Sequence, residues 1–135
     1  MKEPCWLDVH DVCAMQGEIL AESGGASGIL NKGALESTLN KPVNLYHYGD
    51  DITLYKLAAS YGYGLAKNHC FVDGNKRIAL IAVYAFLFVN GIELVASEAD
   101  ATSVFLELAA SIETQEESMG KLAQWLQDNS EIISG

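Results

Sequence analysis

Apolar positions recur along most of the chain three or four residues apart, which is the spacing of α-helices. The clearest stripe belongs to residues 52–68, and its members are Leu54, Leu57, Ala58, Tyr61 and Leu65. A rougher stripe covers residues 7–22 and ends before Gly24 and Gly25, a common way for a helix to stop. Both segments are expected to be amphipathic helices that bury one face against a shared core.

Residues 75–89 follow a different pattern, because they are apolar on almost every side of the predicted helix. The unbroken apolar run covers residues 78–89, twelve positions, whereas a membrane-spanning helix needs roughly 20. We therefore expect a core helix that is enclosed by protein on every side, and no membrane helix.

The remaining segments complete the prediction of an all-α fold. Three further helices are expected, at residues 32–40, 97–112 and 118–127. Pro42 should stop the first of them, and the aromatic segment 43–50 should form an exposed loop or small hairpin. Ser97 with Asp100 is a variant capping box for the second, and residues 91–95 are a short extended piece. The sequence thus predicts a single domain, residues 1–135, of about six helices around a central buried helix.

Composition and charge narrow the possible functions. Half of the residues are hydrophobic and 19% are charged, as in a globular protein. The net charge of −10 repels nucleic acid phosphates, and Lys76 and Arg77 are the only adjacent cations. The three cysteines are odd in number and form no C-x-x-C pair, so we expect reduced thiols. No charged-then-apolar leader opens the chain, so the cytoplasm is the expected compartment, and neither nucleic acid nor membrane is an expected partner.

The segment NHCFVDGNKRIAL, residues 68–80, places polar chemistry at the mouth of the apolar helix. The first N–H groups of a helix lack intrahelical partners and carry the positive end of its dipole. Here that end carries Gly74, which allows close approach of a ligand, and Asn75, which can cap the helix or hold an oxyanion. Lys76 and Arg77 add full positive charge. The combination predicts an anion site, best suited to phosphate.

Two further side chains of this segment suggest catalysis. His69 can accept a proton from a hydroxyl at neutral pH, and Asp73 can hold magnesium beside phosphate oxygens. Together they predict transfer of part of a nucleotide to a hydroxyl. The alternative is an ordinary turn at Asp73–Gly74, a capping Asn75 and a structural histidine. No P-loop pattern is present.

The nine residues HCFVDGNKR, 69–77, resemble the H-x-F-x-[DE]-G-N-x-R signature of Fic proteins. With lysine at position 76, the motif resembles that of the death-on-curing, or Doc, branch of the superfamily. Residues 24–49 are similar to the region that precedes the motif in this family. The resemblance implies an all-helical fold with a small flap and a site that uses ATP and Mg²⁺.

The resemblance also implies a role for each residue. His69 would be the general base, Phe71 an apolar anchor for the loop and Asp73 the magnesium ligand. The phosphates would be bound by Gly74, Asn75 and Arg77. A flap that aligns the target would comprise Leu45, Tyr46, His47 and Tyr48.

Four positions depart from the family pattern of typical Fic AMP-transferases or of many relatives. Typical Fic AMP-transferases have glycine at the position of Lys76 and a second arginine at the position of Leu80, whereas Doc-type proteins share both changes. The resemblance therefore implies a protein kinase whose substrate type is translation elongation factor Tu, with Lys76 and Arg77 as catalytic cations. An AMP-transferase and a catalytically silent binding protein of the same fold are the alternatives. Leu30 and Asn31 stand where many relatives carry an arginine and an acid.

The chain lacks the inhibitory pattern [ST]-x-x-x-E-[GN] by which many Fic proteins restrain themselves. The nearest match runs from Ser103 to Glu107 and is followed by Leu108. The resemblance accordingly implies a toxin of a type II toxin–antitoxin pair, with a separate antitoxin whose disordered segment folds on the toxin surface. The other implied partner is a protein of the translation machinery.

Overall fold

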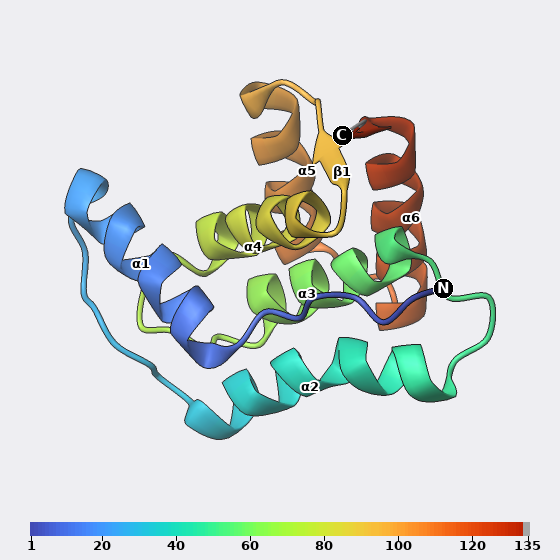
Figure 1. The fold of residues 1–135 in the computed structure, drawn as a ribbon. Helices are drawn as coiled ribbons and strands as arrows, with labels where there is room; N and C mark the ends of the chain where they lie inside the picture. The colour runs from blue at the N-terminus through green and yellow to red at the C-terminus, as the bar shows by residue number, and fades with distance from the viewer. Residues whose placement is uncertain (134–135) are drawn as a thin grey trace.

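The computed structural model describes residues 1–133, and helices dominate it (Figure 1). The elements are α1 Val9–Ser23, α2 Lys32–Tyr48, α3 Leu54–Lys67, α4 Asn75–Val89, β1 Ile92–Leu94, α5 Glu98–Ala110, α6 Gln115–Asp128 and β2 Ser130–Ile132. The prediction of an all-α fold with six helices is confirmed.

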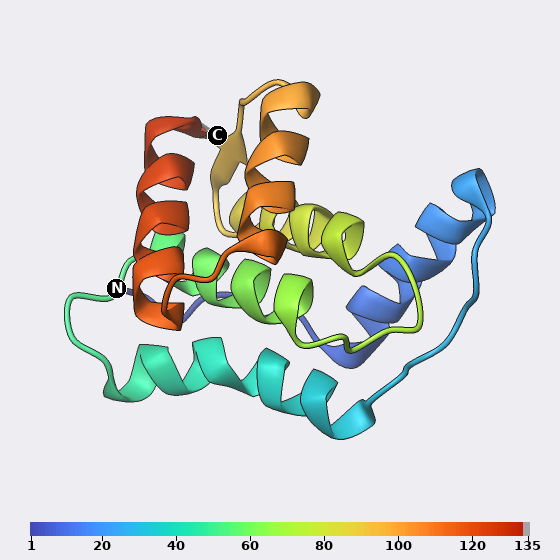
Figure 2. The ribbon, with the colours of Figure 1, turned by 180° about the vertical axis from the view of Figure 1, so that it is seen from behind.

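Helix α3 lies in the middle of the fold, with α4, α2 and α6 packed around it (Figures 1 and 2). Its close packing depends on Gly62, because a Cβ atom there would lie 2.9 Å from Val83 Cγ2 and 3.0 Å from Leu122 Cδ2. Helix α4 in turn packs against α1 and α5. Helices α3 and α4, which flank the motif, are therefore each held by packing against several other elements.

The predicted extended piece at residues 91–95 is confirmed as β1, which pairs antiparallel with β2 in the register Ile92 to Ile132. Strand β2 was not predicted, because residues 130–132 carry no strand pattern. Helix α6 begins at Gln115, three residues before the predicted start, because Thr114 caps it by accepting a hydrogen bond from the Glu117 N–H. Ser97 caps α5 as expected, accepting from the Asp100 N–H at 3.1 Å.

The prediction of a helix that ends before Pro42 is wrong, as is the prediction of a loop or hairpin at residues 43–50. Helix α2 continues through Pro42 to Tyr48. Proline removes one backbone donor from a helix, yet it keeps the apolar stripe intact here. Leu35, Leu39 and Pro42 are buried on the side of α2 that packs on α3. Burial of this stripe outweighs the lost hydrogen bond.

The prediction that α4 is enclosed on every side is also wrong. Its C-terminal half buries Val83, Phe86 and Leu87, but Tyr84 is 39% exposed and Phe88 49% exposed. These two rings stack on each other, with centroids 6.0 Å apart. Among the described residues, no helix is both long and apolar enough to cross a bilayer.

Candidate catalytic site

The motif loop joins α3 to α4 and alternates between exposed and buried side chains. His69 is exposed, and its φ of 48° lies in the left-handed region that non-glycine residues rarely occupy. Cys70 and Phe71 follow and are buried, at 0% and 1% exposure. Burial of Phe71 fixes the loop to the core and leaves His69 and Asp73 at the surface.

Asn75 closes the motif loop. Its amide oxygen accepts the N–H of Phe71 at 3.0 Å, and its amide nitrogen donates to the carbonyl oxygen of Phe71 at 2.9 Å. Both sides of the amide are therefore used within the loop. Asn75 does not cap α4, because the N-cap is Gly74. Its side chain shapes the backbone around the site, and its role as a phosphate ligand stays a prediction.

Residues 28–31 pair with the motif loop. Ile29 forms an antiparallel bridge with Phe71, the Leu30 N–H donates to Cys70 O at 2.8 Å and the Val72 N–H donates to Gly28 O at 3.0 Å. The segment between α1 and α2 thereby forms one wall of the site. Asn31 caps α2 by accepting from the Ala34 N–H at 2.9 Å, and the Leu30 side chain is 62% exposed.

Gln16, on α1, fastens this wall to the motif. Its side chain is 5% exposed, and its amide oxygen accepts the Gly28 N–H at 3.1 Å. Its amide nitrogen donates to Asp73 O at 3.2 Å and Gly28 O at 3.3 Å. Sequence reasoning missed Gln16. The available signal was a glutamine among the apolar positions of the first helix, because a polar side chain on a buried face needs hydrogen-bond partners.

The N-terminus of α4 differs from the other five. Each of the others has a side chain that accepts a backbone N–H of the first turn, and these caps are Asp8, Asn31, Thr53, Ser97 and Thr114. The N-cap of α4 is Gly74, with φ 81°, which provides no side-chain cap. Its first backbone bond runs from Ile78 N to Gly74 O. The N–H groups of Asn75, Lys76 and Arg77 therefore have no partner inside the helix.

The Asp73 carboxylate stands at the same place. Its Oδ1 accepts the Gly74 N–H at 2.9 Å. Its Oδ2 faces Gly25, where an added Cβ atom would lie only 2.8 Å away. Glycine at position 25, with φ 117°, therefore lets the segment before α2 approach the carboxylate closely.

The two cations diverge from the start of α4. Arg77 extends toward the end of α1, where it donates to Ser23 Oγ at 2.9 Å and lies 4.0 Å from a Glu22 carboxylate oxygen. Lys76 is exposed and, with Arg77 and Leu80, lines a small pocket against α5. Both side chains therefore bring positive charge to the start of α4.

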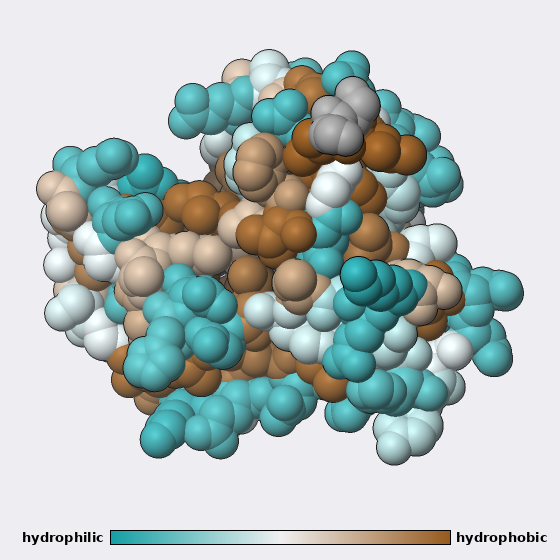
Figure 3. Space-filling view, viewed as in Figure 1, coloured by the Kyte–Doolittle hydropathy of each residue, from teal (hydrophilic) through white to brown (hydrophobic). Residues whose placement is uncertain are grey.

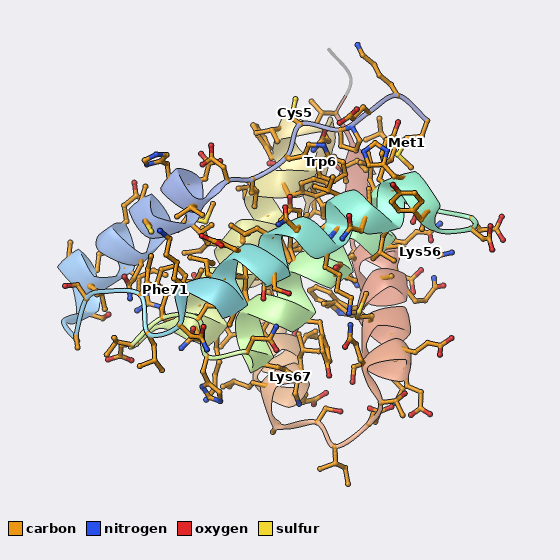
Figure 4. The ribbon with its side chains drawn as sticks, turned by 90° about the horizontal axis from the view of Figure 1, so that it is seen from below. Met1, Cys5, Trp6, Lys56, Lys67 and Phe71 are labelled. Atoms are coloured by element: carbon orange, nitrogen blue, oxygen red, sulfur yellow. The ribbon has the colours of Figure 1, made fainter. Side chains whose placement is uncertain are left out.

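Residues 45–48 lie away from the motif loop. They form the last turn of α2, whereas Asn31, at the start of that helix, donates its N–H to Cys70 O. A helix of 17 residues is about 25 Å long. Tyr46 packs edge-on against Trp6 at 5.7 Å and donates to Met1 O at 3.2 Å. In Figure 4, Phe71 and Met1 accordingly lie toward opposite ends of α2.

Comparison with known proteins agrees with the motif and the fold. The profile of the Fic/DOC family matches residues 6–87, which include the whole motif. "Toxin Doc" of Mycolicibacterium smegmatis is 39% identical over 93 residues, covering 67% of this chain and 68% of that protein. "Protein kinase doc" of Escherichia phage P1 is 26% identical over 88 residues, covering 65% of this chain and 70% of that protein. The chain belongs to the Fic/DOC family, and the resemblance drawn from the motif is confirmed.

Proposed function

We propose that this protein is a Doc-type toxin that transfers a phosphate from ATP to a hydroxyl of a protein in the translation machinery, of the elongation factor Tu type. The observation that carries the proposal is the uncapped start of α4, where three free N–H groups adjoin Asp73, Lys76 and Arg77. Free N–H groups and the helix dipole favour bound phosphate. The names of the two relatives, a toxin and a protein kinase, support this assignment.

The binding of ATP would use the groups at this helix start. The backbone N–H groups of Asn75, Lys76 and Arg77 would hold phosphate oxygens, and the two cationic side chains would neutralise their charge. Among the described residues, no group of three or more His, Cys, Asp or Glu side chains is placed to hold a metal ion. In this proposal Asp73 is the one protein ligand of a magnesium ion, with phosphate oxygens and water completing its shell, as is usual for this ion.

His69 would act as the general base. The target hydroxyl oxygen would attack the γ-phosphorus, and its proton would pass to the imidazole of His69. The bond from the γ-phosphorus to the bridging oxygen would break, and ADP would leave with that oxygen. The exposed position of His69 suits this role, because a protein target must reach the imidazole from outside.

Alignment of the target belongs, in this proposal, to residues 28–31 rather than to residues 45–48. The former segment already pairs with the motif loop through Phe71 and Cys70, and its Ile29 and Leu30 side chains are exposed. An extended stretch of target chain could lie against such an exposed segment.

Phosphate transfer is preferred to AMP transfer because of positions 76 and 80. Lys76 brings a side chain to a helix start that glycine would leave open, and Leu80 supplies no second guanidinium. The name of the phage relative, a protein kinase, favours the same choice. AMP transfer is the second candidate, because the same N–H groups could hold the α-phosphate instead.

A cognate antitoxin would cover the exposed part of α4. Figure 3 shows apolar side chains over the middle of this face and a hollow between the α1 arm and the α5 lobe. A pocket of about 240 Å³ lies between α4, β1 and α5, lined in part by Leu80, Tyr84 and Leu94. An amphipathic segment of the antitoxin could fold into this groove and cover the phosphate site beside it.

The proposal is tested by expression of wild-type protein and of His69→Ala in bacterial cells. Removal of a general base lowers the rate about 10²–10⁴-fold, so His69→Ala should abolish growth arrest without changing the circular dichroism spectrum. His47→Ala is the control, because His47 is an exposed histidine away from the motif, and it should arrest growth like wild type. Growth arrest by a folded His69→Ala chain would disprove the role of His69.

A further inference from the structure

A second polar pocket lies outside the motif, between α2, α3 and the start of α6. Its volume is about 230 Å³, and its polar lining includes Thr38, Lys41, Ser60, Tyr63, Asn68 and Gln115. None of the lining residues belongs to the motif, residues 69–77. Among the residues that line it, Lys41 is the one charged group and none is acidic, although the chain as a whole carries a net charge of −10.

Ser60 lines this pocket and has a buried hydroxyl. The residue is 2% exposed, and its Oγ forms no hydrogen bond within the described part of the chain. Buried polar groups are nearly always hydrogen-bonded, and an unsatisfied one costs about 1–3 kcal/mol. A ligand atom that enters the pocket and bonds this hydroxyl would remove that cost.

Lys41 brings a cation to the same space. Neither ion pair found among the described residues involves Lys41. Its partial burial lowers the pKa of the ammonium group, since water solvates the charge less well there. A lysine that is partly desolvated and has no carboxylate partner is better suited to receive an anion than a fully hydrated one.

The walls of the pocket are held in place without a ligand. A Cβ atom at Gly64 would lie 2.5 Å from Thr38 Cγ2, so α2 and α3 approach each other closely at this point. Asn68 donates its side-chain N–H to Thr38 Oγ1 at 2.9 Å. The pocket is therefore built into the helix packing (Figure 4 views it from the α2 side).

We propose that this pocket is a second ligand site, which takes a small oxyanion, a phosphate or carboxylate group, between the Lys41 ammonium and the Ser60 hydroxyl. Thr38, Tyr63, Asn68 and Gln115 also line the pocket, and their hydroxyl and amide groups can donate hydrogen bonds. The site adjoins the catalytic loop through one contact: Thr38 Oγ1, which bonds Asn68, also lies 3.7 Å from the sulfur of Cys70. An oxyanion bound here would therefore lie next to Thr38 and Asn68, the pair that contacts the start of the catalytic loop.

The test is a titration of the ¹⁵N-labelled full chain, followed by amide NMR signals, with sodium phosphate and, separately, sodium acetate. Sodium chloride at the same ionic strength is the baseline. We expect saturable shifts at Ser60, Tyr63 and Thr38 with at least one of the two anions. Phosphate alone, acetate alone or both would identify the oxyanion that the site accepts. Shifts at Asn75–Arg77 report the helix start of α4 in the same experiment.

Three variants separate the pocket from the rest of the surface. Lys41→Met removes the charge and should weaken binding at the pocket about tenfold or more, while any shifts at residues 75–77 stay as in wild type. Lys2→Met removes the same charge from the exposed N-terminal segment and should change neither. Ser60→Ala should also weaken binding, and it decides the question if Lys41→Met does not fold. Absence of saturable shifts at the pocket with both anions, or unchanged affinity in the folded variants, would overturn the proposal.

Discussion

The side-chain amide of Asn75 is hydrogen-bonded on both sides to the main chain of Phe71, at 3.0 Å and 2.9 Å. This pair links the first residue of α4 to the buried anchor of the motif loop. The loop therefore has its shape before any nucleotide arrives. Such preorganisation lowers the entropic cost of binding.

Asn75→Asp tests this arrangement with a minimal change in shape. The carboxylate can still accept the Phe71 N–H, but it cannot donate to Phe71 O, and it adds negative charge to the anion site. We expect a loss of stability of about 1–3 kcal/mol and a fall of tenfold or more in ATP affinity, measured by chemical denaturation and calorimetry. Asn129→Asp is the control, because Asn129 donates to Trp125 O at the far end of α6. Wild-type ATP affinity in Asn75→Asp would show that this amide does not shape the site.

Gly25→Ala and Gly24→Ala form a second matched pair. Both glycines have positive φ, of 117° and 74°, so alanine strains the backbone at either position. Only at Gly25 would the new methyl group meet Asp73, because nothing lies within 4 Å of a Cβ atom at Gly24. We therefore expect Gly25→Ala alone to reduce the magnesium dependence of ATP binding, by tenfold or more. Calorimetry with and without magnesium measures this, and an equal effect of the two variants would exclude a role for the Asp73 contact.

Lys76 is the residue that we expect to determine whether the protein transfers phosphate or AMP. Lys76→Gly removes both the charge and the bulk, whereas Lys76→Met keeps most of the bulk and removes the charge alone. We expect both variants to transfer phosphate more slowly, and only Lys76→Gly to gain a trace of AMP transfer. Addition of Leu80→Arg should increase that trace, because Leu80 lies one turn further along α4 and is partly exposed. Mass spectrometry of the modified target distinguishes the two adducts. AMP transfer by the wild-type protein would contradict this account of Lys76.

Tyr61 gives the stability of the fold a defined dependence on pH. Its ring is buried, and burial raises the pKa of Tyr61 to about 12, although the Leu7 N–H that donates to its hydroxyl opposes this shift. In the unfolded chain the hydroxyl loses its proton near pH 10. The unfolded state therefore binds fewer protons than the native state above that pH, and stability should fall between about pH 10 and pH 12.

The size of that effect is about 3 kcal/mol for a shift of roughly two units in the pKa of a fully buried tyrosine. Denaturation at several pH values should show a shallower loss in Tyr61→Phe than in wild type. Tyr48→Phe is the control, because Tyr48 is 86% exposed, and it should follow wild type. Parallel curves for wild type and Tyr61→Phe would show that the hydroxyl of Tyr61 titrates normally in the native protein.

The elements that could be predicted from the sequence are those with strong local signals. Helices α3 and α4 have continuous apolar patterns, and the motif marks the start of α4. The predicted end of α2 is wrong because proline usually stops a helix. The apolar stripe of α2 nevertheless continues across Pro42. The apolar pattern also led to a wrong prediction for α4, because the exposed Tyr84 and Phe88 lie in the same run as its buried residues.

The interior of the site was less accessible to sequence reasoning, because it depends on contacts between distant segments. Gln16 bonds Asp73 O across 57 positions, and Gly28 meets Val72 through backbone groups that carry no residue-specific signal. The left-handed backbone of His69, with φ 48°, likewise has no signal in the residue type. Motif spacing therefore located the chemistry, whereas the supporting contacts required the folded chain.

Transfer of label from ATP that is radioactive at one chosen phosphate tests most directly whether this protein is a kinase. Purified protein is incubated with magnesium, with elongation factor Tu as target, and with ATP that carries radioactive phosphorus at either the γ or the α position. We expect the target to acquire label from the γ position alone, and we expect His69→Ala to transfer that label at least a hundredfold more slowly. Label from the α position, or no label from either with a target that is shown to be folded, would contradict this expectation.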